Sequence, residues 1–130
     1  LALLHVVLAR PEFCWQSPPP EYLESVRRHI EKDFYTVLPN PKLAELAGLS
    51  EAGFNRAFKR HFGTTPAQYV IETRVREAAK LLLQTDQAID VIAERTGFPN
   101  RAYFSRVFKR VTDESPAGFR RKHQRQEQPT

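Results

Sequence analysis

The 130-residue sequence contains no methionine, and its only cysteine is Cys14. Because even position 1 is not methionine, we expect that a larger protein has been cut and that its upstream part is missing here. One cysteine cannot form an internal disulfide, and no second cysteine stands at the spacing of a metal site. The composition therefore fits a reducing cytoplasm, with Cys14 as a small apolar residue.

Long apolar runs are missing as well. The opening LALLHVVLAR is apolar over only about ten residues, whereas a membrane-spanning helix needs roughly twenty, and it lacks the basic start of a signal peptide. The sequence thus predicts no membrane anchor. These residues could be the last helix or strand of an upstream domain, or Phe13 and Trp15 could fold back onto the first helix. We assign residues 1–20 to a remnant of that domain and a stiff proline-rich linker.

Signatures of catalysis are also absent. The four histidines show none of the spacings to Cys, Asp or Glu that a zinc or iron site needs. Neither a glycine-rich phosphate loop nor a serine nucleophile elbow occurs. We therefore predict a protein that is not an enzyme and that has no catalytic residue, no metal and no cofactor.

Positive charge is what the sequence has in excess. Lys and Arg number 20 against 15 Asp and Glu, which gives a formal net charge of +5 and a pI near 9.7. This balance favours a polyanionic partner without specifying one. The distribution is more informative, because residues 54–61 and 100–111 each carry several basic side chains and no acidic one.

The two basic stretches are copies of one pattern. The first reads FNRAFKR and the second RAYFSRVFKR, and an offset of fifty residues aligns them. The aligned pairs are Phe54 with Phe104, Arg56 with Arg106, Phe58 with Phe108, Lys59 with Lys109, and Arg60 with Arg110. Upstream the offset is forty-nine, so that Gly48 aligns with Gly97 and the second copy has one extra residue. Two copies are too few for a stacked solenoid, so we predict two similar small modules.

Apolar residues recur at helical spacing, and no useful length of the sequence alternates with the period of a strand. The predicted fold class is all-α, with about seven helices. Short helices are expected to end at Gly48 and Gly97, and a last one to open at Pro116 and give way to disorder past about Gln124, with residues 125–130 as a polar tail. The longer helices are expected at about residues 21–33, 51–62, 66–84 and 100–111.

Several helix ends are marked by capping residues. Asn40 and Ser50 are predicted N-caps, and Thr85 or Asp86 is predicted to cap the first short helix of the second copy. Asp113 stands where the first copy has a terminating glycine. An aspartate can adopt the left-handed conformation that this position requires, so we expect the helix to end in the same way.

A short helix, a turn at a glycine, and a second helix with one apolar and one basic face predict a helix-turn-helix in each copy. The outer face of the second helix would enter a major groove, where Arg and Asn can pair with base edges and residues further along can meet phosphates. On this reasoning we predict base-reading roles for Asn55, Arg56, Arg101, Ser105 and Arg106. We predict phosphate contacts for Ser50, Lys59, Arg60, Asn100, Lys109 and Arg110.

Six motifs also carry a family resemblance: LAELAGLS, FNRAFKRHFGTTPAQYV, RVREAAKLLL, IAERTGF, YFSRVFKR and ESPAGFR. Together they resemble the C-terminal DNA-binding domain of the arabinose-regulator (AraC/XylS) family of bacterial transcription factors, over about residues 21–122. The resemblance implies a domain at residues 21–124 with two helix-turn-helix lobes, about 21–65 and 85–124. A connecting helix at about 66–84 would span about 27 Å, which suits two recognition helices in successive major grooves.

By position, the family's base-reading sites fall on Ala52, Asn55, Arg56, Arg101, Ala102 and Arg106. Ala52 and Ala102 can offer only methyl contacts. Because Asn55 stands where the second copy has Ser105, the two lobes should read different bases, and the expected target is an asymmetric double-stranded promoter site. The resemblance further implies a bacterial cytoplasmic regulator that usually activates transcription through RNA polymerase. It also implies an upstream ligand-sensing or dimerisation domain, which is missing from this sequence.

Two other interpretations remain. An interaction module that has lost DNA binding would not need a basic bias on the outward faces, so it is disfavoured. A DNA-repair alkyltransferase with a similar DNA-binding domain could use Cys14 as acceptor. That interpretation ranks lower still, because a reactive thiol needs an activating base or metal and the neighbouring sequence offers neither.

Overall fold

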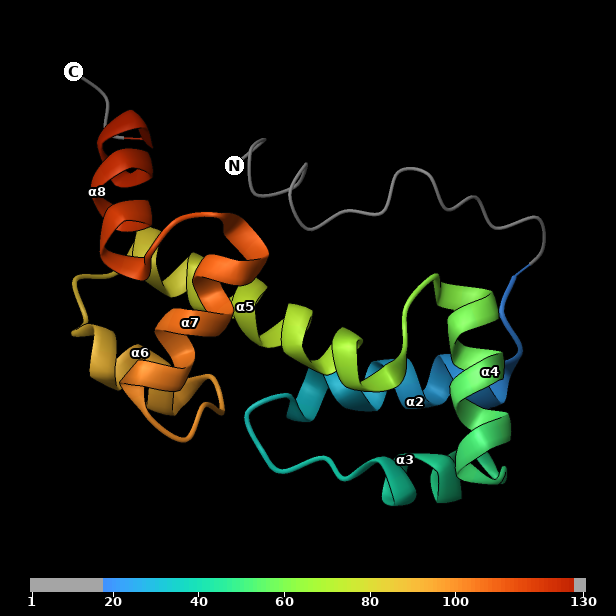
Figure 1. Cartoon of the computed structure of the whole chain (residues 1–130). Coiled ribbons are helices and arrows are strands. Elements are labelled where there is room, and N and C mark those ends of the chain that lie inside the picture. Colours follow the sequence, from blue (N-terminus) through green and yellow to red (C-terminus); the bar gives the residue numbers. More distant parts are fainter. Residues whose placement is uncertain (1–17, 128–130) are drawn as a thin grey trace. The chain divides into compact units, whose positions relative to one another are not determined.

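The computed structural model describes residues 18–127, with side chains as far as Gln124, so the predictions for Phe13, Cys14 and Trp15 lie outside it. In this range the chain forms seven α-helices and no strand, which confirms the predicted class (Figure 1). None of these helices is long and apolar enough to cross a membrane. The helices are α2 (Glu21–Asp33), α3 (Asn40–Ala47), α4 (Glu51–Phe62), α5 (Pro66–Gln84), α6 (Ile89–Arg95), α7 (Arg101–Thr112) and α8 (Pro116–Glu127).

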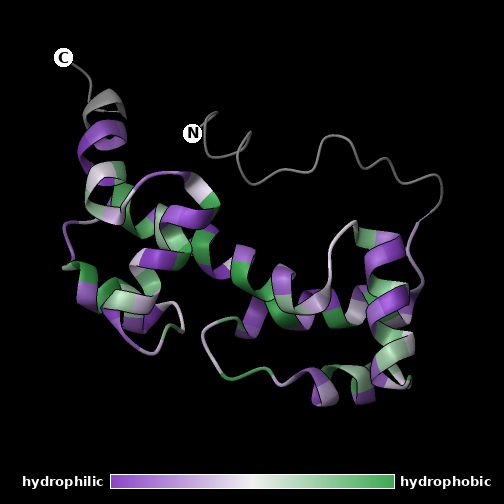
Figure 2. Cartoon of the chain, viewed as in Figure 1, coloured by the Kyte–Doolittle hydropathy of each residue, from purple (hydrophilic) through white to green (hydrophobic). Residues whose placement is uncertain are grey.

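The described residues form two compact units, which we call the N-terminal unit (residues 18–73) and the C-terminal unit (residues 74–127). In the N-terminal unit, the apolar stripe of each helix faces a common core, and the polar faces stay outside (Figure 2). Because these stripes repeat every three or four residues, a helix is the conformation that buries them together. The buried core residues are Leu23, Val26, Ile30, Leu43, Ala44, Ala47, Phe54, Ala57, Phe58, Phe62 and Val70.

The C-terminal unit repeats this packing with the partners that the sequence repeat supplies. In the first copy, the ring of Phe58 lies 5.7 Å from Phe54 and 5.5 Å from Tyr69, measured between centroids. In the second copy, the ring of Phe108 lies 5.6 Å from that of Phe104. Phe119, the counterpart of Tyr69, lies 5.2 Å from Phe108. The aromatic repeat is therefore core in both copies, and the pairs Phe58–Tyr69 and Phe108–Phe119 each join the second helix of their copy to the helix that follows.

The predicted cap at Ser50 is confirmed, and two other predicted caps are wrong. The Ser50 hydroxyl accepts a hydrogen bond from the amide of Gly53 at 3.1 Å. Asn40 is the first helical residue of α3 instead of its cap, because Pro39 precedes the helix in an extended conformation and the Asn40 side chain turns to α4. Neither Thr85 nor Asp86 caps α6, whose N-cap is Ala88.

Thr85 contacts the end of α5 instead. Its hydroxyl donates to the carbonyl of Leu81 at 2.7 Å, which satisfies one of the last acceptors of that helix. At the end of α7, Asp113 adopts φ 68°, close to the φ 77° of Gly63 at the end of α4. The predicted left-handed conformation of Asp113 is confirmed.

The last helix is longer than predicted, since α8 continues to Glu127 where disorder was expected past about Gln124. Side chains of α8 reach the carbonyls at the end of α5. Arg120 donates from Nε to the carbonyl of Leu82 at 3.0 Å and from its terminal nitrogen to that of Thr85 at 3.1 Å. Gln124 donates to the carbonyl of Leu83 at 3.4 Å. These contacts join residues roughly forty positions apart, so local sequence patterns did not predict them.

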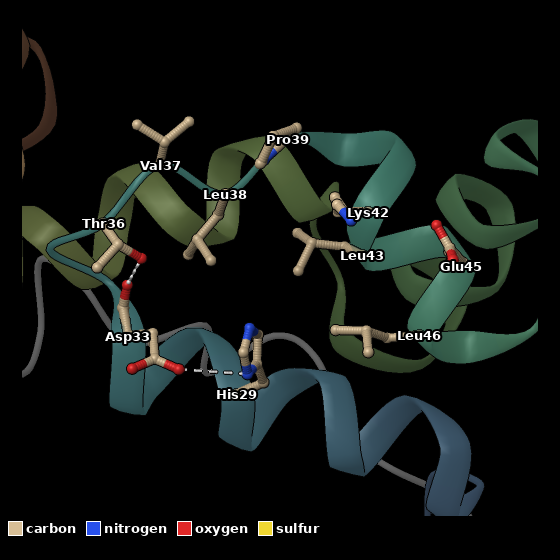
Figure 3. A pocket seen from close by; sticks show the side chains of 10 residues that line it. All are labelled: His29, Asp33, Thr36, Val37, Leu38, Pro39, Lys42, Leu43, Glu45 and Leu46. Atoms are coloured by element: carbon tan, nitrogen blue, oxygen red, sulfur yellow. Dashed lines mark hydrogen bonds and ion pairs between the residues drawn. The ribbon is translucent and has the colours of Figure 1, made fainter.

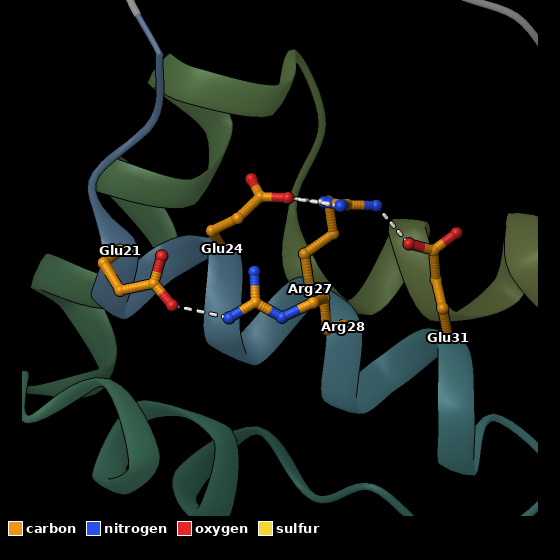
Figure 4. Close-up of polar contacts among 5 residues, drawn as sticks. All are labelled: Glu21, Glu24, Arg27, Arg28 and Glu31. Atoms are coloured by element: carbon orange, nitrogen blue, oxygen red, sulfur yellow. Dashed lines mark hydrogen bonds and ion pairs between the residues drawn. The ribbon is translucent and has the colours of Figure 1, made fainter.

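Ion pairs join side chains along α2 (Figure 4). Arg27 contacts Glu24 and Glu31, one turn away on either side, and Arg28 contacts Glu21. The hydrogen bond that Arg27 donates to the Glu24 carboxylate raises the pKa of Arg27, although partial burial acts in the opposite direction. Because Arg27 is half-buried and doubly paired, it rigidifies α2 and is poorly placed to meet a polyanion.

Candidate nucleic-acid interface

Helix α4 separates an apolar face from a polar one. Phe54, Ala57, Phe58 and Phe62 are buried, which turns the opposite side of the helix to solvent. Ser50, Ala52, Asn55, Arg56, Lys59 and Arg60 are all exposed. Every α4 residue to which the sequence assigned a DNA contact is thus accessible, together with the cap at the start of the helix.

Helix α7 has the same division. Phe104, Val107 and Phe108 are buried, and the Asn100 side chain caps the helix by accepting from the amide of Tyr103 at 2.8 Å. Asn100, Arg101, Ala102, Arg106, Lys109 and Arg110 are exposed. Ser105 is only half-buried and is the least accessible of the α7 residues assigned to DNA.

The two helices are basic at their C-terminal turns. Lys59, Arg60 and His61 stand in the last turn of α4, and Lys109 and Arg110 in the last turn of α7. Cations there also complement the negative end of the helix dipole. The side chains of Lys59, Arg60, Lys109 and Arg110 make no hydrogen bond or ion pair with another described residue, so their charges remain available to an anion.

Three of the residues assigned to base reading have partners inside their own unit. Asn55 accepts at Oδ1 from Nδ2 of Asn40 at 3.1 Å. Arg101 pairs with Asp90, with 3.1 Å between its terminal nitrogen and the carboxylate oxygen. The guanidinium of Arg106 lies 5.9 Å from the ring centroid of Tyr103, within range of a cation–π contact. These contacts orient long polar side chains that would otherwise lose entropy on binding.

A short helix, a turn and a second helix with an exposed basic face thus occur twice in the chain. A family model described as "Helix-turn-helix domain" matches residues 43–122, which include both copies. Solved AraC-type domains share the fold. The chain belongs to the AraC-type helix-turn-helix family. Members of this family are DNA-binding transcription regulators.

Two curated relatives illustrate the family. The chain is 36% identical over 103 residues to the bifunctional transcriptional activator/DNA repair enzyme AdaA of Bacillus subtilis. The matched segment covers 79% of the chain and 49% of AdaA. The chain is also 37% identical over 100 residues to the transcriptional regulator GlxA of Rhizobium meliloti. This match covers 77% of the chain and 30% of GlxA. The chain therefore spans half or less of the length of these relatives.

Two solved domains match the AraC-type fold of the chain closely. One is the C-terminal domain of AraT, a response regulator from Geobacillus stearothermophilus, with a TM-score of 0.77, 32% identity, and coverage of 82% of this chain and 88% of that one. The other is the DNA-binding domain of AdpA, solved in complex with a target DNA, with a TM-score of 0.77 and 29% identity. It covers 85% of this chain and 97% of the AdpA chain.

The connecting helix α5 of this AraC-type domain carries further cations, among them Arg74 and Lys80. Lys80 pairs with Glu77 at 2.9 Å. Burial lowers the pKa of the Arg74 guanidinium, so this side chain is partly withdrawn from solvent. We therefore leave both residues out of the candidate interface.

The N-terminal unit of this AraC-type domain also has a groove of about 770 Å³ between α2 and α3, which sequence reasoning missed (Figure 3). Val37 and Leu46 at its edge are 84% and 60% exposed. At the offset of forty-nine, their counterparts in the second copy are Asp86 and Arg95. The replacement of two apolar residues by charged ones is the sequence difference that could have indicated a groove in the first copy only. The lining residues are His29, Asp33, Thr36, Val37, Leu38, Pro39, Lys42, Leu43, Glu45 and Leu46.

Proposed function

We propose that this domain binds a specific double-stranded DNA site, with α4 and α7 as recognition helices in major grooves. The observation that carries the proposal is the repeated pair of exposed basic faces, each held outward by a buried aromatic core on the same helix. An α-helix fits the width of a major groove, and exposed Arg and Asn side chains can donate to base edges there. The similar AdpA domain was solved in complex with a target DNA, which supports DNA binding by this fold.

Within each helix we assign two kinds of contact. Base reading falls to the exposed residues on the groove-facing side, and Ser105 contributes less because it is half-buried. Phosphate contacts fall to the two helix caps and to the basic last turns, where the charges are unpaired within the described residues. The base-reading set is Ala52, Asn55, Arg56, Arg101, Ala102, Ser105 and Arg106. The phosphate set is Ser50, Lys59, Arg60, Asn100, Lys109 and Arg110.

In our proposal the DNA target is asymmetric, and α4 and α7 occupy successive major grooves. Asn55 in α4 has Ser105 as its counterpart in α7, and the start of α7 carries Arg101. Two recognition helices with different reading residues call for two different half-sites. A palindrome is therefore not expected for a single chain.

The wider role is that of a transcription regulator in a bacterial cytoplasm, more specifically an activator that contacts RNA polymerase and is controlled by an upstream domain. Names such as the transcriptional activator Btr and the bifunctional activator AdaA, both of Bacillus subtilis, support activation. The larger size of these relatives supports a further domain. We assign no catalytic step to this domain, since its match to AdaA spans only 49% of that protein.

Selection of the 130-residue chain on a random duplex library, followed by footprinting, tests the proposal. We expect enrichment of one asymmetric sequence and protection in two adjacent major grooves. The wild type should lose affinity as salt rises, because phosphate contacts release counterions. An absence of enrichment at low salt would contradict DNA binding and favour the protein-interaction alternative.

A further inference from the structure

The hydrogen bond between Asn40 and Asn55 affects which atoms of a base-reading side chain can face DNA. Asn40 is the first residue of α3, and Asn55 lies on the exposed side of α4, fifteen positions later. Nδ2 of Asn40 donates to Oδ1 of Asn55 at 3.1 Å. The carbonyl end of the Asn55 amide is therefore turned toward α3, and its NH2 group has no acceptor among the described residues.

An asparagine that reads adenine uses both ends of its amide. It accepts from the adenine N6 amino group and donates to N7. Guanine instead presents two neighbouring acceptors, N7 and O6, in the same groove. An amide whose oxygen is turned toward α3 and whose NH2 group is free can donate to both guanine acceptors, whereas reading adenine would require the same oxygen to face the base and accept a second hydrogen bond.

We propose that Asn40 is a specificity-determining residue, which by holding the Asn55 amide in this orientation makes Asn55 select guanine over adenine. This inference rests on the proposed function, since it assumes that α4 enters a major groove. Asn40 touches no base in the proposal and acts only through Asn55. It is a positioning residue in the N-terminal unit.

The C-terminal unit contains a parallel contact. Asp90 is the second residue of α6, the short helix that precedes α7, and its carboxylate pairs with Arg101 at 3.1 Å. In each unit, the first turn of the short helix thus orients a reading residue of the helix that follows. The two contacts differ in chemistry, because an amide holds an amide in one and a carboxylate holds a guanidinium in the other. This difference adds to the expected asymmetry of the site.

The substitution Asn40→Asp reverses the hydrogen bond and so tests the proposal. An aspartate cannot donate, but its carboxylate can accept from the NH2 group of Asn55, which turns the Asn55 oxygen outward. An acid in the first turn of α3 also suits the positive end of the helix dipole, so the fold should be retained. Asn40→Ala removes the hydrogen bond without reversing it. Lys42→Ala, on the exposed side of α3, is the matched control.

The measurement is competition binding on the selected site with each of the four base pairs at the position that Asn55 reads. That position is identified as the one where Asn55→Ala loses its base preference. We expect the wild type to favour guanine over adenine by about tenfold, within the range for one base contact. Asn40→Ala should reduce this ratio to about twofold or less, and Asn40→Asp should shift the preference to a base with an exposed amino group, adenine or cytosine. Lys42→Ala should leave the ratio unchanged.

The outcomes separate the inference from the proposed function. If Asn55→Ala keeps every base preference, the base-reading role of Asn55 is rejected, and the inference fails with it. If Asn55→Ala loses a preference but both Asn40 variants retain the wild-type ratio, DNA reading stands and the positioning role of Asn40 is overturned. A wild-type preference for adenine at this position would also overturn it. Circular dichroism melting of each variant shows that the comparison is made between folded proteins.

Discussion

The imidazole of His123 meets the carboxylate of Glu114 at 2.8 Å, measured from Nε2 to Oε2. His123 is 5% exposed, and its ring packs against that of Phe119 at a centroid distance of 4.5 Å. The contact ties α8 to the turn that follows α7. Among the described residues, Glu114 is the hydrogen-bond partner of the His123 ring, through Nε2.

His123→Ala should therefore lower the free energy of unfolding by about 1–3 kcal/mol, because it removes a buried hydrogen bond and leaves the Glu114 carboxylate without that donor. Urea denaturation measures the loss. A double-mutant cycle with Glu114→Ala should give a coupling energy of at least about 0.5 kcal/mol. Strict additivity of the two single variants would show that the pair contributes nothing of its own.

The repeated aromatic core gives a pair of matched substitutions. Phe58→Ala and Phe108→Ala should each destabilise the chain by about 3–5 kcal/mol, because both rings are fully buried and the cavities are lined by other rings. Val37→Ser, at an 84% exposed position, should stay within about 0.5 kcal/mol of the wild type. Chemical unfolding of the three variants checks the contrast, and equal effects for Val37 and Phe58 would refute the assigned core.

Asp113 carries a backbone cost that its counterpart Gly63 avoids. At φ 68° a residue with a Cβ atom is strained, although aspartate tolerates the conformation better than most. Asp113→Gly should raise the free energy of unfolding by up to about 1 kcal/mol, and Gly63→Ala should lower it by about the same amount. Thermal melts monitored by circular dichroism measure both. Destabilisation by Asp113→Gly would mean that the side chain makes a compensating contact.

Arg106 and Lys109 separate base reading from phosphate binding on one helix. Arg106→Ala should weaken cognate binding by about 1–3 kcal/mol and relax the preference at one base position. Lys109→Ala should weaken binding to all sequences about equally and lower the salt slope by about one. Titrations on cognate and random duplexes at several salt concentrations distinguish the two. Equal losses for Arg106→Ala on both duplexes would reject its base-reading role.

Ser50 has two proposed jobs, capping α4 and contacting a phosphate, which one substitution can separate. Ser50→Ala should cost about 1 kcal/mol of stability, because the amide of Gly53 loses its acceptor. Ser50→Asp keeps an acceptor at the cap but places a negative charge against the phosphate. We expect near wild-type stability for Ser50→Asp with DNA affinity reduced at least about tenfold. Undiminished affinity would place the phosphate away from this cap.

Much of the architecture is encoded by local patterns that a sequence displays openly. The spacing of Phe54 and Phe58 sets the buried side of α4, and the same spacing at Phe104 and Phe108 sets that of α7. The cap at Ser50 and the left-handed end at Asp113 involve only neighbours within about one turn. Exposure of the residues assigned to DNA, except the half-buried Ser105, follows from the same periodicity. Their contacts with bases and phosphates stay predictions.

The failures lie where a side chain chooses between a local and a distant partner. Asn40 has the residue type of a cap, but its amide contacts Asn55 in the next helix. Thr85 was assigned to the start of α6, but its hydroxyl bonds back to α5. Disorder was expected past about Gln124, but α8 continues to Glu127. Its side chains Arg120 and Gln124 bond to backbone carbonyls at the end of α5, which no local pattern predicted.

The sequence alone thus determined the helices, the twofold internal repeat, the buried face of each recognition helix and the family. Those features depend on residue type and on spacings of three, four or fifty positions, which the chain carries in its linear order. Only the tertiary structure decided which polar groups meet across helices, as in Asn40 with Asn55 and Asp90 with Arg101. Helix packing brings those groups within hydrogen-bonding distance, and no periodicity within a single helix specifies which side chain will face which.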